Sequence, residues 1–218
     1  KKNNRPLVVA NISDAMTKTE YSWLRLILVN HGAGQSYIGE GGKRNKSYAG
    51  GYGRHNVALF LNPNDYSNKL DEMKYPYAEH IVVGCPKMDE WHLKTLSNQI
   101  NKWDGKSKPV IAISFHWDCH VVPETRSAWE HFKSAISGLA DNKDWIVLGH
   151  GHPRILDELS VVYESCGIEV VRRFDDVLER ANLYVADHMS TLYEFASTDR
   201  PVVVLNAPWY RRNVNHGL

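Results

Sequence analysis

The chain has 218 residues, enough for one large domain or two small ones with a substantial core. Its formal net charge at pH 7 is only +1, which disfavours proteins dedicated to binding nucleic acid or anionic lipid. Three widely spaced cysteines argue against a disulfide framework and for a reducing compartment, so we expect a cytoplasmic protein. Since no apolar run reaches about 18 residues, we expect no integral membrane association.

Short apolar runs along the chain predict β-strands. Most runs are continuous rather than alternating, which is typical of strands covered by helices on both faces, as in parallel sheets. The runs cover residues 6–10, 24–29, 56–61, 79–84, 108–115, 144–149, 168–171, 182–187 and 200–206.

Helical patterns separate the strands most clearly in the second half. Residues 124–140 place Ala128, Phe132, Ile136 and Leu139 on one face, residues 154–167 end at Gly167 as a C-cap, and residues 190–198 form a short third helix. Residues 89–109 contain a further helix and then a polar linker. The alternation predicts an α/β fold with doubly wound sheets. We place a domain boundary near residue 105, giving domains 1–105 and 106–218, of which the first is short. Both ends of the chain are abrupt, so we expect a trimmed form of a larger architecture.

A polar cluster follows the predicted strand at residues 24–29. His31 and Gly32 open a glycine-containing loop that continues through Gln35. A histidine at a strand end beside flexible backbone suits a general base or a phosphate contact. The alternative is a turn histidine bonded to local backbone. Further along, a glycine-rich loop offers Arg54, and also Lys43, Arg44 or Lys46, to an anionic substrate, or forms a solvated basic loop.

The stretch 147–155 contains the second cluster. His152 precedes Pro153, a residue suited to the first turn of a helix, so an anion near His152 would face a helix N-terminus. Arg154 adds a guanidinium that can bind phosphate in a bidentate manner. The alternative is that His150 and His152 only shape the turn.

The third cluster lies at the start of the predicted helix 190–198. Ser190 and Thr191 can direct hydroxyls and backbone N–H groups at a phosphate, or they can form an ordinary N-cap. Glu194, one turn later, can accept hydrogen bonds from ribose hydroxyls or can be an exposed glutamate.

The fourth cluster follows the predicted strand 108–115. His116, Asp118, Cys119 and His120 contain metal-ligand chemistry, but their spacing matches no familiar zinc pattern, and whether they hold a metal stays open. We favour a loop that faces a bound nucleotide, with Trp117 or His116 beside it.

Together these stretches resemble the CDP-glycerol glycerophosphotransferase family, which is similar to the nonhydrolysing UDP-N-acetylglucosamine 2-epimerases and other GT-B transferases. The resemblance spans residues 7 to 210. It is carried by "LVNHGAGQSY", "VVGCPKMDEW", "VLGHGHPR" and "ADHMSTLYEFASTDRPVVVLN" in this order.

The resemblance implies a GT-B-like fold, with two Rossmann-like domains facing a cleft, an acceptor-side first domain and a donor-binding second domain. It implies His31 as the catalytic base and His152 at the donor phosphates, with Ser190 and Thr191 at a phosphate-binding helix and no required metal or cofactor. The remaining expected contacts are Gly32, Arg154, Glu194 and His116 on the donor side and Gln35 and Arg54 on the acceptor side.

The chain departs from the family at His116-Trp117-Asp118, where the family carries a Thr-Trp-Arg type sequence, so Arg126 or Arg154 would have to supply the missing phosphate-binding arginine. His188 and Met189 also replace the family's Tyr-Ser pair.

The predicted function is a nucleotide-diphosphate-dependent transferase that moves a glycerol-phosphate or glycosyl group from a CDP- or UDP-type donor to a hydroxyl. The acceptor would be a polyol, sugar or polymer, with nucleic acid considered only as an acceptor. The alternatives are a nucleotide-sugar glycosyltransferase, including a phage enzyme that modifies DNA, a sugar epimerase, and a non-catalytic nucleotide-binding domain.

Overall fold

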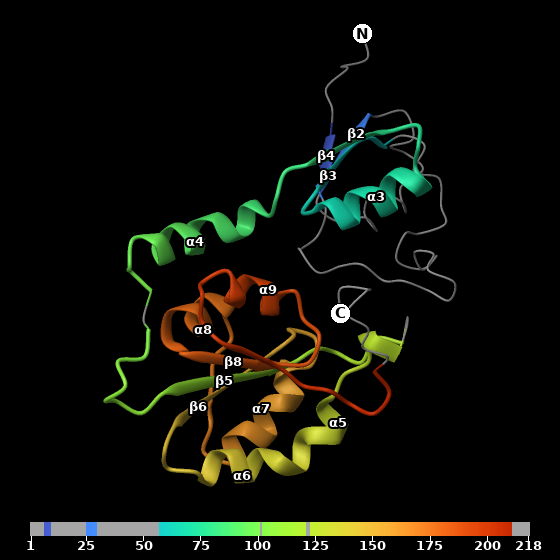
Figure 1. Cartoon of the computed structure of the whole chain (residues 1–218). Coiled ribbons are helices and arrows are strands. Elements are labelled where there is room, and N and C mark those ends of the chain that lie inside the picture. Colours follow the sequence, from blue (N-terminus) through green and yellow to red (C-terminus); the bar gives the residue numbers. More distant parts are fainter. Residues whose placement is uncertain (1–6, 10–24, 30–56, 101, 121–122, 211–218) are drawn as a thin grey trace. The chain divides into compact units, whose positions relative to one another are not determined.

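The computed structural model describes residues 7–9, 25–29, 57–100, 102–120 and 123–210. The chain divides into two compact units, the first ending at Pro86 and the second beginning at Lys87 (Figure 1). Residues 89–96, which the sequence analysis assigned to the first domain, belong to the second unit. No helix in these described ranges is both long and apolar enough to cross a membrane.

The first unit contains a four-stranded parallel sheet with the strand order β1-β2-β3-β4. Its small core is formed by Leu26, Leu28, Val57, Phe60 and Tyr75, and the Phe60 ring stacks on the Tyr75 ring at 5.2 Å between centroids. The elements are β1 (Leu7–Val9), β2 (Leu26–Val29), β3 (Val57–Asn62), α3 (Asp65–Lys74) and β4 (Glu79–Val82).

The second unit contains a five-stranded parallel sheet in the order β7-β6-β5-β8-β9. The chain starts at the central strand, moves outward on one side and then returns to the other, so the order reverses between β5 and β8. The strands are β5 (Val110–Phe115), β6 (Ile146–Gly151), β7 (Glu169–Val170), β8 (Leu183–Ala186) and β9 (Val202–Val204). Across the described residues, each predicted apolar run overlaps a strand, which confirms that part of the sequence analysis, although β3 and β6 extend one and two residues beyond their runs.

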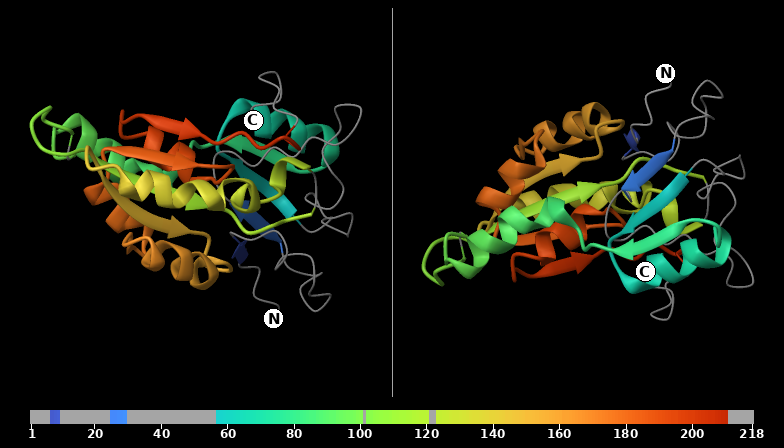
Figure 2. Two further views of the ribbon diagram at one scale, coloured as in Figure 1. Left: turned by 90° about the horizontal axis from the view of Figure 1, so that it is seen from below. Right: turned by 90° about the horizontal axis from the view of Figure 1, so that it is seen from above.

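Helices cover both faces of the second sheet (Figures 1 and 2). On one face, Trp91, Leu178 and Phe195 bring α4 (Asp89–Leu96), α8 (Phe174–Arg180) and α9 (Thr191–Ala196) onto the sheet. On the other, α5 (Trp129–Phe132), α6 (Ile136–Asp141) and α7 (Leu156–Ser165) pack on Ile113, Phe115 and Val147. Burial on both faces explains why the β5 sequence is continuously apolar rather than alternating.

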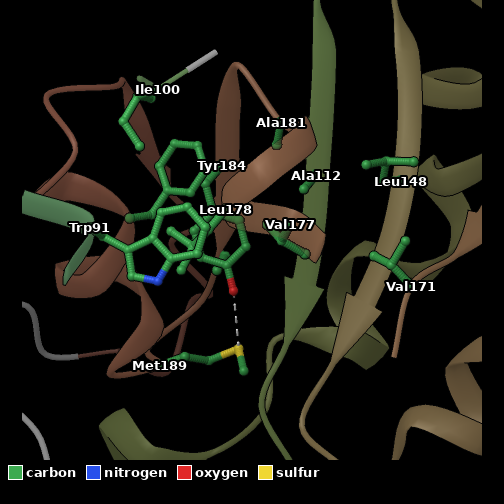
Figure 3. Packing of buried hydrophobic residues seen from close by; sticks show 12 residues of the cluster. Trp91, Ile100, Ala112, Leu148, Val171, Val177, Leu178, Ala181, Tyr184 and Met189 are labelled. Atoms are coloured by element: carbon green, nitrogen blue, oxygen red, sulfur yellow. Dashed lines mark hydrogen bonds between the residues drawn. The ribbon is translucent and has the colours of Figure 1, made fainter. Parts of the chain in front are cut away.

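The core under α4, α8 and α9 includes Met189, which follows β8. Figure 3 shows Trp91 and Tyr184 within it, and the Tyr184 hydroxyl points to the sulfur of Met189 at 3.8 Å. The hydroxyl of Ser114 donates to the same sulfur at 3.1 Å. Met189 therefore ties the segment after β8 to the end of β5.

Two helix predictions need correction. The helix expected over 124–140 is divided into η5 (Pro123–Thr125), α5, η6 (Lys133–Ala135) and α6, although its predicted apolar face is buried in the core as expected. Just before α5, the Ser127 N–H donates to Asp118 and the Ala128 N–H donates to Asp187. The helices α3 and α8 were not predicted; α3 has little apolar surface, and Asp65 within it gives only the weak signal of an acidic first turn.

The predicted end of α7 is confirmed. Gly167 has a φ of +72°, the left-handed conformation that glycine adopts without steric cost. The Ile168 N–H donates to the Tyr163 carbonyl at 2.9 Å, which closes the helix C-terminus and directs the chain into β7.

Candidate functional site: the carboxyl ends of β5, β6 and β8

Histidines follow three neighbouring strands of the second sheet. His116 comes directly after β5, His152 directly after β6, and Asp187 and His188 directly after β8. Because all five strands are parallel, these residues lie at the same edge of the sheet. In open α/β sheets, ligands bind outside the carboxyl ends of the strands where the strand order reverses. Here this position, which we call the switch point, lies between β5 and β8.

The aromatic rings at this edge lie close together. The ring centroid of His116 is 4.4 Å from that of His188 and 4.8 Å from that of His152. The Arg154 guanidinium lies over the Trp117 ring, 4.4 Å from its centroid. Residues from three strand ends thus form one polar and aromatic cluster, which we call the histidine cluster: His116, Trp117, His152, Arg154 and His188.

Asp187 holds the backbone around this cluster. Its carboxylate is fully buried and accepts from the backbone N–H groups of His116, Ala128 and His188, with the shortest distances at 3.0, 3.1 and 2.8 Å. Burial raises the pKa of Asp187, and these backbone donors counter part of that effect. One carboxylate therefore joins the segments after β5, after β8 and before α5.

His116 presents a hydrogen-bond acceptor. Its Nδ1 lies 2.9 Å from the Trp117 carbonyl oxygen, and since a carbonyl can only accept, Nδ1 must carry the proton. Nε2 then holds a lone pair, and it has no hydrogen-bond partner within the described part of the chain. Burial, followed by the neighbouring His188, lowers the pKa of His116 to about 3, so the ring is neutral near pH 7.

His152 has the opposite arrangement. The Arg154 backbone N–H donates to His152 Nδ1 at 3.2 Å, so Nδ1 is unprotonated and the neutral ring carries its proton on Nε2. Burial and the Arg154 charge lower the pKa of His152. Its carbonyl oxygen accepts from the Ile155 and Leu156 N–H groups, which sets the turn that leads into α7.

His150 lies within strand β6 rather than in the turn that the sequence analysis considered for it. It is buried, its Nδ1 lies 2.9 Å from the Ser114 hydroxyl, and burial lowers its pKa to about 4. The glycines beside it have a packing role: a Cβ on Gly149 would overlap the Tyr163 ring, and one on Gly151 would overlap Leu159. The Gly-His-Gly-His pattern thus lets α7 approach β6 closely.

The start of α9 differs from an ordinary N-cap. Ser190 occupies the cap position without a side-chain cap hydrogen bond, and the Thr191 hydroxyl lies 2.9 Å from the Tyr184 hydroxyl. The Glu194 side chain is buried and accepts from the Lys87 ammonium at 2.8 Å. Glu194 is therefore not an exposed helix glutamate, and its Oε1 is engaged by Lys87.

The fourth cluster forms an ion-pair network. Asp118 accepts from Arg126 at 3.3 Å, from the Ser127 N–H at 3.1 Å, and lies 3.0 Å from His120 Nε2. Hydrogen bonds and the charge of Arg126 lower the pKa of Asp118 against the effect of burial. Arg126 is thus paired with Asp118, while Arg154 lies in the histidine cluster. In the ranges that the structure describes, no group of three or more His, Cys, Asp or Glu side chains is arranged to hold a metal ion.

Several predicted site residues lie outside the described residues. They are His31, Gly32, Gln35 and Arg54, together with Lys43, Arg44 and Lys46. Of the predicted donor-side residues, the structure brings His116, His152 and Arg154 together. The sequence analysis did not single out Asp187; its signal was an acidic residue directly after a buried strand at the switch point.

No family model matches the chain, and no curated protein matches it in sequence. Solved structures match its fold. The S. aureus MnaA–UDP co-structure has a TM-score of 0.55 at 14% identity, and the match covers 93% of this chain and 56% of the MnaA chain. A histidine variant of the wall teichoic acid polymerase TagF has a TM-score of 0.53 at 16% identity, and the match covers 90% of this chain and 53% of the TagF chain. A UDP-N-acetylglucosamine 2-epimerase structure from Listeria monocytogenes has a TM-score of 0.52 at 12% identity, covering 92% and 56%.

The chain spans about half the length of these solved structures. At such low identity the likeness concerns the fold alone. It agrees with the two parallel sheets and confirms the predicted α/β, GT-B-like fold class.

Proposed function

We propose that the second unit binds a nucleotide-diphosphate-activated donor and that the chain is a transferase of the GT-B type. In this proposal, it moves a glycerol-phosphate or glycosyl group from a CDP- or UDP-linked donor to the hydroxyl of a polyol, sugar or polymer. The donor is a substrate, and the proposal requires no cofactor. The observation that carries it is the histidine cluster at the switch point of the second sheet.

The described residues offer donors for a phosphate at this edge. His152 carries an N–H on Nε2 in its neutral form, and Arg154 carries a guanidinium two residues later. Fixed donors of this kind stabilise the negative charge that develops on a leaving nucleotide, which is a major source of rate enhancement in group transfer.

The transfer step needs a base for the acceptor hydroxyl, and by the family resemblance we assign this role to His31. The hydroxyl oxygen forms a bond to the donor phosphorus or anomeric carbon, its proton passes to His31, and the bond to the leaving nucleotide breaks. Positioning the two reactants together removes much of the entropic barrier to the reaction.

A thermal-shift and calorimetry panel with CDP, UDP, GDP, ADP and dTDP tests the binding half of the proposal. A ligand that binds only the folded chain, at one hundred times its Kd, stabilises it by about 2.7 kcal/mol. We expect this stabilisation with CDP or UDP and its reduction in His152→Ala. If none of the five nucleotides binds, the proposed function is wrong.

Turnover tests the catalytic half. We expect release of CMP from CDP-glycerol, or of UDP from a UDP-sugar, when a polyol acceptor is supplied, and a large loss in His31→Ala. Unchanged turnover in His31→Ala would rule out its role as the base.

Sugar epimerisation is the second candidate, because two of the structural neighbours are MnaA bound to UDP and a UDP-N-acetylglucosamine 2-epimerase. The same panel separates the two functions. An epimerase converts UDP-N-acetylglucosamine without an acceptor, whereas a transferase requires one. Nucleotide binding with neither reaction would favour a non-catalytic nucleotide-binding domain.

A further inference from the structure

Two histidines of the cluster carry their ring protons on opposite nitrogens. In His116, Nδ1 donates to the Trp117 carbonyl at 2.9 Å, which leaves a lone pair on Nε2. In His152, Nδ1 accepts from the Arg154 N–H at 3.2 Å, which leaves an N–H on Nε2. Backbone groups fix both assignments, because a carbonyl can only accept and an amide N–H can only donate.

The two rings are near neighbours, with centroids 4.8 Å apart. His116 is also held by its backbone N–H, which donates to the buried Asp187 carboxylate. His152 is held at the turn before α7 by its carbonyl, which accepts from the Ile155 and Leu156 N–H groups. The hydrogen-bond acceptor Nε2 of His116 and the hydrogen-bond donor Nε2–H of His152 therefore belong to two neighbouring rings, each held by backbone hydrogen bonds.

The chemistry of the two rings differs in what each can bind. A phosphate oxygen is itself an acceptor, so it would be repelled by the lone pair of a neutral His116. A hydroxyl or amide N–H of a ligand can donate to that lone pair instead. Because burial and His188 lower the pKa of His116 to about 3, the ring holds a proton too weakly to serve as an efficient general base.

We propose that His116 and His152 form a complementary pair, in which His116 accepts from a ligand hydroxyl and His152 donates to a phosphate oxygen of the same ligand. This inference rests on the proposed function and sharpens it. The ligand class is a phosphate ester whose hydroxyl lies close to its phosphate, as in nucleotide-linked polyols and sugars. It also narrows the donor-side contact that the sequence analysis expected of His116 to a hydroxyl of the ligand.

The first test needs no ligand. Nitrogen-15 NMR of the histidine rings in the full chain distinguishes a protonated from an unprotonated ring nitrogen. We expect the proton of His116 on Nδ1 and that of His152 on Nε2, with assignments made by loss of each signal in the His116→Gln and His152→Gln variants. A His116 ring protonated on Nε2 near neutral pH would overturn the inference.

The second test compares binding of three probes: inorganic pyrophosphate, CDP and CDP-glycerol. Pyrophosphate has no carbon-bound hydroxyl, CDP adds the ribose hydroxyls, and CDP-glycerol adds those of glycerol. We expect His116→Phe, which keeps a ring but removes the acceptor, to weaken CDP-glycerol about three- to tenfold, the range of one hydrogen bond, while changing pyrophosphate by less than about twofold. If the same variant also loses affinity for CDP, the hydroxyl that donates to His116 belongs to the ribose rather than to the glycerol.

Matched variants complete the design. His116→Gln places an amide oxygen near the position of Nε2 and should restore part of the lost affinity. His152→Phe should weaken pyrophosphate and CDP-glycerol alike, and His92→Phe, an exposed histidine on α4, should weaken neither. Circular dichroism of each variant shows that it is folded.

The outcomes distinguish failure of the paired histidine roles from failure of the proposed function. A wild-type chain that binds none of the probes overturns the proposed function. A wild-type chain that binds, but whose His116→Phe variant loses pyrophosphate as much as CDP-glycerol, overturns the pairing of roles and leaves the proposed function standing.

Discussion

The strand ends of the two sheets use polar residues in different ways. In the first unit, Asn62 at the end of β3 is buried and its amide donates to the Asn68 side chain at 3.1 Å, while Asn64 caps α3 by accepting from the Ser67 N–H at 2.8 Å. Both asparagines bond to the helix that follows them. Their polar groups support the local fold.

In the second unit, by contrast, the local hydrogen bonds fix the orientation of two histidine rings through one nitrogen of each. His116 and His152 each use Nδ1 in a hydrogen bond with a backbone group, and our proposal assigns Nε2 of both rings to the ligand. The comparison separates two kinds of strand-end residue: those whose hydrogen bonds go to the next helix, and those whose second ring nitrogen our proposal assigns to a ligand.

Asp187→Ala should give the largest effect, because three buried or half-buried backbone N–H groups lose their acceptor. Each unsatisfied donor costs about 1–3 kcal/mol, so we expect a loss of about 3 kcal/mol or more in the free energy of unfolding measured by urea denaturation. The matched control is Asp118→Ala, since Asp118 is partly exposed and should cost much less. If Asp187→Ala does not fold, Asp187→Asn, which retains one carbonyl oxygen, should lie between the two. Equal losses at Asp187 and Asp118 would contradict the framework role.

Acid should destabilise the second unit through its buried histidines. The folded-state pKa values of His150 and His116 are about 4 and about 3, below the ordinary value of about 6.5. The unfolded chain therefore binds protons that the folded chain rejects, so the stability is present above about pH 6.5 and is lost as the pH falls toward about 4. The loss is up to about 1.4 kcal/mol per pH unit for each histidine.

Asp187 acts in the opposite direction, since burial raises its pKa and its protonation on acidification favours the folded state. We therefore expect a slope below the sum for two histidines in urea denaturation between about pH 7 and about pH 5. His150→Gln should reduce this slope. A slope identical to that of the wild type would show that His150 is not held neutral by the fold.

Gly149→Ala tests why glycine is required within β6, where α7 packs on the strand. The new methyl group would overlap the Tyr163 ring, and we expect a loss of about 1–3 kcal/mol on thermal or urea unfolding. Gly138→Ala in α6 is the control, because its Cβ meets nothing within 4 Å and alanine favours the helix by about 0.5–1 kcal/mol. A neutral Gly149→Ala would mean that α7 can shift away from β6 without loss of stability.

Asn64→Ala should give the smallest effect and would sharpen the comparison from the side of the first unit. Loss of the N-cap bond to the Ser67 N–H costs about 1 kcal/mol of stability. Binding of CDP or UDP should be unchanged, because this strand-end residue bonds to its own helix. Reduced nucleotide affinity in a folded Asn64→Ala variant would assign a binding role to the first sheet's strand end as well.

Local sequence patterns predicted much of the second unit. Continuous apolar runs predicted each described strand, and the helix face formed by Ala128, Phe132, Ile136 and Leu139 is buried as expected. Gly167 predicted a helix end, because its missing side chain permits a positive φ. The helices α3 and α8 were missed, and the helix over 124–140, which was predicted unbroken, is divided in the structure. The acceptors of the N–H groups just before α5, Asp118 and Asp187, lie in other segments, which a local helical pattern does not reveal.

The sequence by itself determined the α/β class and the positions of His116, His152 and Arg154 after strands, because strand burial and turn chemistry are local properties. Only the tertiary structure decided which of those residues meet. The strand order β7-β6-β5-β8-β9 brings segments 36 and 71 residues apart to one sheet edge, as the contacts of Ser114 with His150 and of His116 with Asp187 show. The ring-proton positions of His116 and His152 also depend on the folded backbone, because they follow from which backbone group each Nδ1 faces.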